Sequence, residues 1–552
     1  MVRFRPPLQV YVYWRQAFAL GDQLHRALFR SLNRDLEEPE SRGIGIPVYG
    51  RGDLVEGAFA PDSRPQAHSR VRIVLIDSGA ADDDAWVPAL RALLDRASGE
   101  LVLPILIQQA PLRDVDPRLS AIHAIDLSAA PDVADALERS AVHELARLLL
   151  ARPRTADAPS SPAPVRLFLS HAKRDGVPIA RALKEQIQEH SAADAFFDAH
   201  DITPGSPFPL EIFESIEHSA LIVVQTDAYA SREWCRREVI EAKRRSRPVV
   251  VINAIESGEE RGFPYLGNVP TVRWNRSDED SKNAHRALGL ALKETLRTAY
   301  FRAFWGALAP LLAPEQLELL ALARPPELLL PDLSPNPGRV VVYPDPPLGD
   351  EELQLLATHR SEIRPMTPLT LMWRGFGQEE RPLEGKTISL SLSAASPAEL
   401  SRRGLDLMHV EDVAIECARY LLASGGRLAY GGDLRPGGFT EKLVALVRRH
   451  NRASGDPFHR LENYLAWHVH VGTTATADVL SSCWLLHGSA STRRLRAGSC
   501  GPSILVMEAA EHGEGDDVPL GRAVRRDRGL LSPPGSEGPS ISGITGTQGP
   551  TR

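Results

Sequence analysis

The sequence predicts a multidomain α/β protein built on parallel β-sheets. Short apolar runs alternate with amphipathic segments over most of its 552 residues, as in chains of βαβ units. Runs 71–77, 165–169 and 220–224 are mostly apolar, which is typical of strands covered by helices on both faces. One hydrophobic core does not organise a chain of this length, so about three or four domains are expected.

The bulk composition excludes several classes of protein. Hydrophobic residues make up 43% of the chain and the formal net charge is −7, which is not the charge of a typical nucleic-acid-binding protein. Four cysteines are too few for a disulfide framework and fit a reducing compartment. No apolar run approaches the ~20 residues that cross a bilayer, and no signal peptide is visible. We expect a soluble, cytoplasmic protein without nucleic-acid or membrane partners.

Residues 1–150 are expected to form a first α/β domain. The patterns place strands at 10–14, 71–77 and 101–107 and helices at 23–32 and 142–150. The run Asp82-Asp83-Asp84 fits the start of a helix, where carboxylates are favoured, better than a metal site. Residues 151–164 are rich in Pro, Ala and Ser and predict a linker.

A second α/β domain is predicted at 165–305. Its first strand, 165–169, leads into a polar loop, and Ile179, Leu183 and Ile187 follow at helical spacing. The patterns place further strands at 196–198, 220–224, 248–252 and 272–274, and helices from Trp234 and over 284–308.

This domain carries three motifs in order. They are Phe168-Leu169-Ser170-His171 followed by Lys173 and Asp175, then Asp198 with the loop of Pro204-Gly205, then Trp234-Cys235-x-x-Glu238. Together they resemble a TIR domain of the bacterial type, over about a quarter of the chain. The resemblance implies a flavodoxin-like parallel sheet.

The resemblance implies one of two activities. Some TIR domains only associate with one another, and others cleave the bond between nicotinamide and ribose in NAD+. The enzymatic ones have a glutamate at the position of Glu238, which is therefore the expected catalytic residue. The expected substrate-binding residues are Ser170, His171, Lys173, Asp175, Asp198, Trp234 and Cys235. NAD+ would be the substrate, and no cofactor is implied.

One carboxylate is enough for this chemistry. The nicotinamide of NAD+ is cationic and departs as a neutral base, so no general acid has to protonate it, unlike an ordinary glycoside. A carboxylate beside the ribose stabilises the oxocarbenium-like transition state. Trp234 and Glu238, four residues apart, share one face of a helix near the sheet edge where nucleotides bind. Spacing alone also allows a Trp234 packed in the core and a solvated Glu238.

The first domain loosely resembles a second, degenerate TIR-like fold. Its acidic loop, helix and strand follow one another in a similar order, but it has no Trp-Cys-x-x-Glu motif. We therefore assign it no catalysis and expect a role in interaction or regulation. A packing domain of unrelated ancestry is the alternative.

A third α/β region follows a helical and proline-rich linker at 306–338. It spans 339–480, with a joining subdomain at its start. The patterns place strands at 339–343, 367–373, 387–393 and 427–430, helices at 350–363, 413–424 and 441–449, and a connector at 405–409.

A glycine-rich turn, 431–440, joins the last of these strands to the last helix. Exposed amides and the positive end of a helix form an anion site, glycines let a phosphate approach the backbone, and Arg435 can pair with it. The Gly-x-Gly-x-x-Gly fingerprint is absent, so hydride chemistry is not indicated. A turn without a ligand is the alternative.

This turn and the Ser-x-Ser-x-Ser run of strand 387–393 resemble a SLOG domain, a Rossmann-like fold. Such domains are proposed to sense nucleotide-derived ligands in bacterial defence systems. The resemblance implies ligand contacts from Ser391, Gly431, Gly432, Asp433, Arg435, Gly438, Phe439 and Thr440.

The tail, 481–552, is expected to be disordered or to replace a truncated end of the SLOG-like fold. His468, His470 and Cys483 lack the spacing of metal ligands, and no metal site is predicted.

The two resemblances imply an effector of antiphage defence. A nucleotide-derived signal at the SLOG-like region would promote self-association of the TIR-like units and NAD+ hydrolysis. The alternatives are a non-catalytic scaffold and a cyclase that makes a cyclic ADP-ribose messenger.

Overall fold

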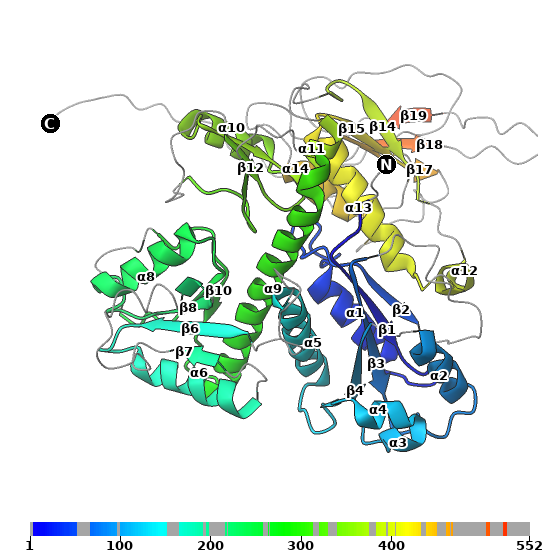
Figure 1. Ribbon diagram of the computed structural model, residues 1–552. Helices are drawn as coiled ribbons and strands as arrows, with labels where there is room; N and C mark the ends of the chain where they lie inside the picture. The colour runs from blue at the N-terminus through cyan, green and yellow to red at the C-terminus, as the bar shows by residue number, and fades with distance from the viewer. Residues whose placement is uncertain are drawn as a thin grey trace, which may run out of the picture. The chain divides into compact units, whose positions relative to one another are not determined.

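A computed structural model shows mixed α/β architecture with several parallel sheets (Figure 1). It describes residues 4–51, 67–96, 100–151, 165–190, 195–197, 216–217, 219–257, 263, 265–312, 319–328, 339–374, 382–392, 396–402, 404–431, 438–449, 460–463, 465–466, 504–507 and 523–526. The chain divides into two compact units: residues 1–386, 392–426 and 448–455 form the first, and 387–391, 427–447 and 456–552 the second. Within the described part, no helix has the length and apolarity to span a membrane.

The first sheet has the strand order β2-β1-β3-β4-β5, and all its strands are parallel. Its strands are β1 (Leu8–Tyr13), β2 (Val48–Arg51), β3 (Ser69–Ile76), β4 (Leu101–Leu106) and β5 (Ile125–Asp126), and its helices are α1 (Gly21–Leu32), α2 (Trp86–Arg96), α3 (Leu112–Val115), α4 (Pro117–Ala121) and α5 (Val133–Leu150). The order is that of a flavodoxin-like sheet. The edge strand β2 was not expected from the sequence.

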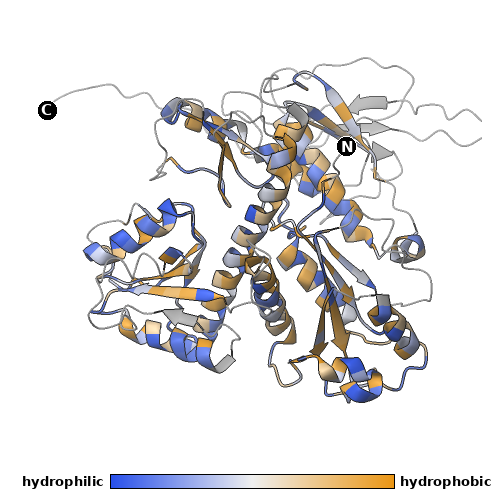
Figure 2. Cartoon of the chain, viewed as in Figure 1, coloured by the Kyte–Doolittle hydropathy of each residue, from blue (hydrophilic) through white to orange (hydrophobic). Residues whose placement is uncertain are grey.

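The second sheet repeats this order as β7-β6-β8-β9-β10, again all parallel. Its elements are β6 (Arg166–His171), α6 (Val177–His190), β7 (Ala195–Phe197), β8 (Ala220–Gln225), α8 (Glu233–Arg244), β9 (Val249–Asn253), β10 (Thr271–Arg273) and α9 (Asp280–Leu312). Orange strands in Figure 2 mark the apolar runs on which these sheets were predicted. Strands β6, β8 and β9 are largely buried on both faces because helices cover both.

Helices α5 and α9 join the two sheets into one core. The same cluster of buried side chains contains Leu137 and Leu145 of α5, and Leu288, Leu292 and Leu296 of α9. It also contains one face of each sheet. Packing these helices together removes a large apolar area from water, which stabilises the first unit.

A third, smaller sheet has the order β11-β12-β13 and is parallel. Its strands are β11 (Leu319–Ala321), which lies in the expected linker, β12 (Arg339–Val342) and β13 (Ile363–Met366), and α10 (Asp350–His359) joins the last two. The sequence-based helix at 350–363 was therefore too long.

The strand expected at 367–373 was wrong, since Pro368–Arg374 form helix α11. Thr367 Oγ1 accepts a hydrogen bond from the Thr370 amide at 3.3 Å. Thr367 thus caps the helix, and Pro368 occupies its first turn, where its missing N–H costs nothing. The Thr-Pro pair was the overlooked helix-start signal.

Helix α13 (Leu407–Ala423), which α12 (Pro397–Arg402) precedes, packs against the first domain. Asp406 caps α13 by accepting from the Met408 amide at 2.8 Å, so the connector expected at 405–409 is partly helical. Arg34 pairs with Asp412 at 2.5 Å and with Glu416. Arg419, 1% exposed, pairs with Glu416 at 2.7 Å and donates to the carbonyl oxygen of Ser41 at 2.8 Å.

Asp345 joins the small-sheet region to α13 by accepting a hydrogen bond from the Tyr420 hydroxyl. Burial raises the pKa of Asp345 to about 6. Its folded-state pKa is above the unfolded value, so its contribution to stability is present below pH ~4 and is lost as the pH rises to ~6. Asp345→Asn is therefore expected to raise the melting temperature at pH 8 relative to wild type, and less so at pH 4.

Differential scanning calorimetry of both proteins between pH 4 and 8 measures this difference. Buried His25, whose pKa is lowered to about 4 by burial, has the opposite pH dependence but contributes equally to both proteins. A difference in melting temperature that is independent of pH would contradict the assignment.

The second unit contains the sheet β14-β15-β16, formed by β14 (Thr387–Leu390), β15 (Arg427–Tyr430) and β16 (Leu461–Asn463), all parallel, with helix α14 (Phe439–Arg449) after β15. A further sheet contains β17 (Leu465–Ala466), β18 (Ile504–Met507) and β19 (Ala523–Arg526). The last two strands lie in the tail that was expected to be disordered, which is a difference from the sequence-based expectation.

Candidate active site

The candidate site lies at the carboxyl edge of the second sheet, between β6 and β8. The chain runs from β6 to β7 on one side and returns to β8 on the other. The loops after β6 and β8 therefore diverge, and in such sheets ligands bind in the crevice that this reversal leaves.

Side-chain alternation along β6 decides which residues face helix α8. Leu167 and Leu169 belong to the cluster that includes α6 and α9, whereas Phe168 packs with Cys235 and Val239 of α8. Successive side chains of a strand point to opposite faces. Ser170 therefore faces α8 with Phe168, where it meets Glu238.

Three buried polar side chains form the centre of the site. Ser170 Oγ donates to Glu238 Oε2 at 2.5 Å, and it lies 2.6 Å from the Tyr229 hydroxyl. The single proton of Ser170 is used on Glu238, so Tyr229 is the donor in the second contact. Ser170, Tyr229 and Glu238 are 1%, 0% and 6% exposed. The relay fixes the position of the carboxylate.

The groups around Glu238 remain neutral at physiological pH. Burial raises the pKa of Tyr229 well above its usual value, and the nearby Cys235 and Glu238 add to this. Burial, followed by the Glu238 carboxylate, raises the pKa of the Cys235 thiol to about 12. Cys235 therefore supplies packing and has little thiolate to act as a nucleophile.

Cys235 is expected to resist alkylation. Of the cysteines within the described ranges, Cys235 is buried and Cys417 is exposed. Brief treatment of the native protein with iodoacetamide at pH 8, followed by peptide mass spectrometry, should label Cys417 and leave Cys235 largely unlabelled. Both should react in urea. Equal labelling in the native state would contradict the burial and raised pKa of Cys235.

Asp175 ties together the two loops that border the site. Its carboxylate accepts from Thr226 Oγ1 at 2.6 Å and from the Ala228 amide at 2.9 Å. Thr226 and Ala228 follow β8, and Asp175 follows β6. Asp175 therefore positions the loops around the site, and the substrate contact expected of it stays a prediction.

The other expected site residues differ in how far they are exposed to solvent. His171 ends β6 and is half-buried, and Lys173 is exposed in the following loop. Trp234 is 37% exposed, with the Arg237 guanidinium 5.1 Å from its ring centroid. Asp198 lies outside the described residues. Trp234 and Glu238 thus begin the same helix, one at the surface and the other inside.

Tyr229 is a site residue that the sequence motifs did not indicate. It lies in the turn between β8 and α8, where its ring packs against Phe263 at 5.5 Å. The sequence feature that could have identified Tyr229 is its position, four residues after a buried strand at the switch between β6 and β8.

A second candidate site lies at the carboxyl edge of sheet β14-β15-β16. Ser391 follows β14 and Gly431 follows the neighbouring β15, while Gly438 precedes α14. Phe439 packs edge-on against Tyr430 at 5.4 Å, and Thr440 is 1% exposed. The structure thus brings two strand ends and a helix N-terminus together. Gly432, Asp433 and Arg435 lie outside the described residues.

Within the described part of the chain, no cluster of three or more His, Cys, Asp or Glu side chains could hold a metal ion.

Comparison with known proteins supports both resemblances. Residues 167–288 match the family model of the TIR domain, and residues 382–483 match that of SLOG cluster2. The chain therefore carries a TIR domain and a SLOG domain. No curated protein matches it significantly. The crystal structure of tagatose-6-phosphate ketose/aldose isomerase from Escherichia coli is 14% identical, with a TM-score of 0.15 over 53% of this chain and 81% of that chain. A TM-score this low does not indicate a shared fold.

Proposed function

We propose that this TIR–SLOG protein is an NAD+ glycohydrolase activated by a nucleotide-derived ligand at its SLOG domain. The observation that carries the proposal is the Glu238 carboxylate, which Ser170 holds at 2.5 Å beside the carboxyl edge of the TIR sheet. In its biological role, the protein would deplete NAD+ as an effector of antiphage defence.

Glu238 would stabilise positive charge on the ribose. When neutral nicotinamide departs, the ribose carbon acquires oxocarbenium character, and a fixed carboxylate in a poorly solvated site stabilises it strongly. Tyr229 stays protonated because its pKa is raised well above the usual range by burial. The relay from Tyr229 through Ser170 keeps the carboxylate in place without adding a second negative charge.

The burial of Glu238 supports regulation of this activity. Its side chain is 6% exposed and one carboxylate oxygen accepts from Ser170. A ribose hydroxyl would have to replace or join Ser170 at this carboxylate. We therefore propose that activation involves rearrangement of the loops after β6 and β8, which Asp175 holds together.

The SLOG domain would supply the signal. The strand ends at Ser391 and Gly431 and the start of α14 lie at one sheet edge, where main-chain amides and the helix dipole favour an anionic ligand. A nucleotide-derived ligand has such a group. Self-association of TIR domains after ligand binding would complete the active form.

The test is release of nicotinamide by the purified full-length chain, measured at increasing protein concentration with and without cyclic nucleotides and ADP-ribose derivatives. The proposal predicts release by wild type that Glu238→Ala abolishes, with linear ADP-ribose as the second product. Cyclic ADP-ribose would identify a cyclase. Absence of release under every condition, with biological activity retained by Glu238→Ala, would identify a scaffold.

A further inference from the structure

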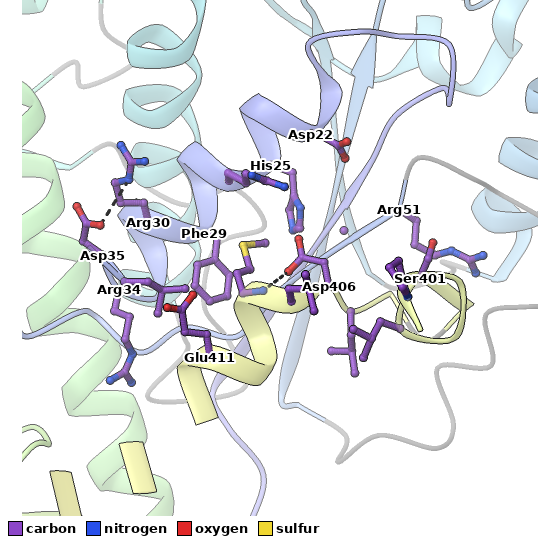
Figure 3. Close-up of a pocket in the computed structure, with 18 of the residues that line it drawn as sticks. Asp22, His25, Phe29, Arg30, Arg34, Asp35, Arg51, Ser401, Asp406 and Glu411 are labelled. Carbon is purple, nitrogen blue, oxygen red and sulfur yellow. Dashed lines mark hydrogen bonds and ion pairs between the residues drawn. The ribbon is translucent and has the colours of Figure 1, made fainter. Parts of the chain in front are cut away.

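A second cavity, separate from the TIR and SLOG sites, lies at the carboxyl edge of the first sheet (Figure 3). Its volume is about 560 Å³. One wall comes from Trp14, one face of α1 with the residues 34–37 that follow it, and the end of β2, and the other from α12 and the start of α13. All of these elements belong to the first compact unit. A cavity of roughly 300–1,000 Å³ is the size that holds a small organic ligand.

His25 lines this cavity with a buried imidazole ring. The side chain lines the cavity and is 3% exposed, and Nε2 has no hydrogen-bond partner among the described residues. The ring packs 5.3 Å from the Trp14 ring, and a Cβ at Gly50 would come within 2.5 Å of Nε2. Glycine at position 50 therefore leaves room for the imidazole. A buried ring nitrogen without a partner is costly, and a ligand that bonds to it removes that cost.

The charges around the cavity are nearly balanced. Among the lining residues that the structure describes, four arginines accompany five carboxylates. Three of the arginines are engaged: Arg34 pairs with Asp412 at 2.5 Å, Arg30 lies 3.7 Å from Asp35, and Arg51, 2% exposed, also interacts within the fold. Arg26, exposed midway along α1, makes no ion pair within the described part of the chain. One free cation suits one phosphate, and the five carboxylates disfavour a polyanion.

We propose that this cavity binds a nucleoside that carries at most one phosphate. The carboxyl edge of a parallel sheet is the usual place for such ligands. Apolar side chains such as Phe29 and Met408 would contact the flat base, and His25 Nε2 would take one of its polar edges. Arg26 would face the phosphate of a nucleoside monophosphate.

Ligand binding here would connect the first domain to α13. Because α12 and α13 form one wall of the cavity, a bound nucleoside touches both walls and stabilises their association. A ligand that binds only this folded arrangement raises its stability by mass action. The site is independent of the SLOG glycine-rich turn, so a second small molecule can influence the same protein.

Isothermal titration calorimetry of the full chain tests the proposal, with adenosine, AMP and ATP as probes. Adenosine and AMP should each bind saturably, and ATP at least tenfold more weakly than AMP. Ser401→Trp places an indole in the cavity from α12, and His25→Phe removes Nε2 while keeping an aromatic ring on Trp14. Each variant should weaken AMP binding at least tenfold. Gln23→Ala, exposed on α1 outside the cavity lining, is the matched control and should bind as wild type does.

Circular dichroism and the melting temperature without ligand show whether each variant is folded. Two independent variants on opposite walls keep the test decisive if one fails to fold. Gly438→Val, at the SLOG turn, tests whether AMP binds at the SLOG domain instead of this cavity. AMP binding that survives Ser401→Trp but is lost in Gly438→Val would overturn the proposal, as would tighter binding of ATP or no saturable binding of any probe.

Discussion

Glu238→Gln is expected to lower the rate of nicotinamide release by about 10²–10³-fold, the loss seen when one preorganised electrostatic group is removed from an active site. Glutamine has the shape of glutamate, and its side-chain oxygen can still accept the 2.5 Å hydrogen bond from Ser170. The negative charge is what disappears. The expected effect therefore isolates charge stabilisation of the ribose from packing of α8. Single-turnover assays with excess enzyme measure the rate of bond cleavage separately from product release.

Glu233→Gln is the matched control for this substitution. Glu233 begins the same helix, is exposed, and pairs with Arg237 at 3.0 Å. Exposed ion pairs contribute roughly 0–1 kcal/mol to stability, so this variant should retain the wild-type rate. A Glu238→Gln protein that keeps more than about a tenth of the wild-type rate, well above the loss expected for such a group, would remove Glu238 from the proposed chemistry.

Arg419→Met should weaken the docking of α13 on the first domain by about 3–5 kcal/mol, as is typical when one partner of a buried ion pair is removed. The methionine side chain fills much of the same space but cannot donate to the Ser41 carbonyl or pair with Glu416. The buried carbonyl oxygen loses its partner, which is costly in itself.

Amide hydrogen exchange across α13 measures this effect directly, because local opening can be followed without two-state unfolding of the whole chain. Exchange of α13 amides should accelerate by about two to four orders of magnitude, the rate change that corresponds to this free energy at 1.4 kcal/mol per tenfold. Arg244→Met, whose side chain is 53% exposed on α8, should leave α13 exchange unchanged. Unchanged exchange in Arg419→Met would show that the apolar contacts of α13 are sufficient.

Much of the fold could be predicted because strands of the parallel sheets are apolar on both faces. β6, β8 and β9 are short unbroken apolar runs, and each was placed within about two residues, as expected for such patterns. The strand predicted at 367–373 was wrong because its apolar residues fit either a strand or a short helix, and only the Thr367 cap distinguishes the two. β11 was missed because its three residues precede a proline-rich stretch that indicated a linker. β13 was missed because Arg364 and Pro365 interrupt its apolar residues, and proline is uncommon inside strands.

Local motifs predicted the candidate-site residues that lie within them. Residues that meet only through the fold could not be predicted. Ser170 and Glu238 lie in separate motifs that the resemblance brought together, and the structure places them in contact. Tyr229 lies in neither motif, and its role depends on how a turn folds over the sheet. Arg34 and Arg419 read as ordinary surface charges in the sequence. Nothing local shows that Arg34 pairs with Glu416 and Arg419 with the Ser41 carbonyl, each more than 370 positions away.

The position of α13 affects how this protein can be dissected into fragments. The family match for the SLOG domain runs from 382 to 483, yet residues 392–426 of that range belong to the first compact unit. A shortened chain ending near residue 381 would expose Arg34 and the carbonyl of Ser41, while an isolated SLOG fragment would carry a helix stripped of its partner surface. Both pieces would be prone to aggregation or misfolding for reasons unrelated to catalysis or sensing. Activity lost in such truncations is therefore no measure of autoinhibition, and single-residue substitutions in the intact chain are the sounder way to assign each domain its part.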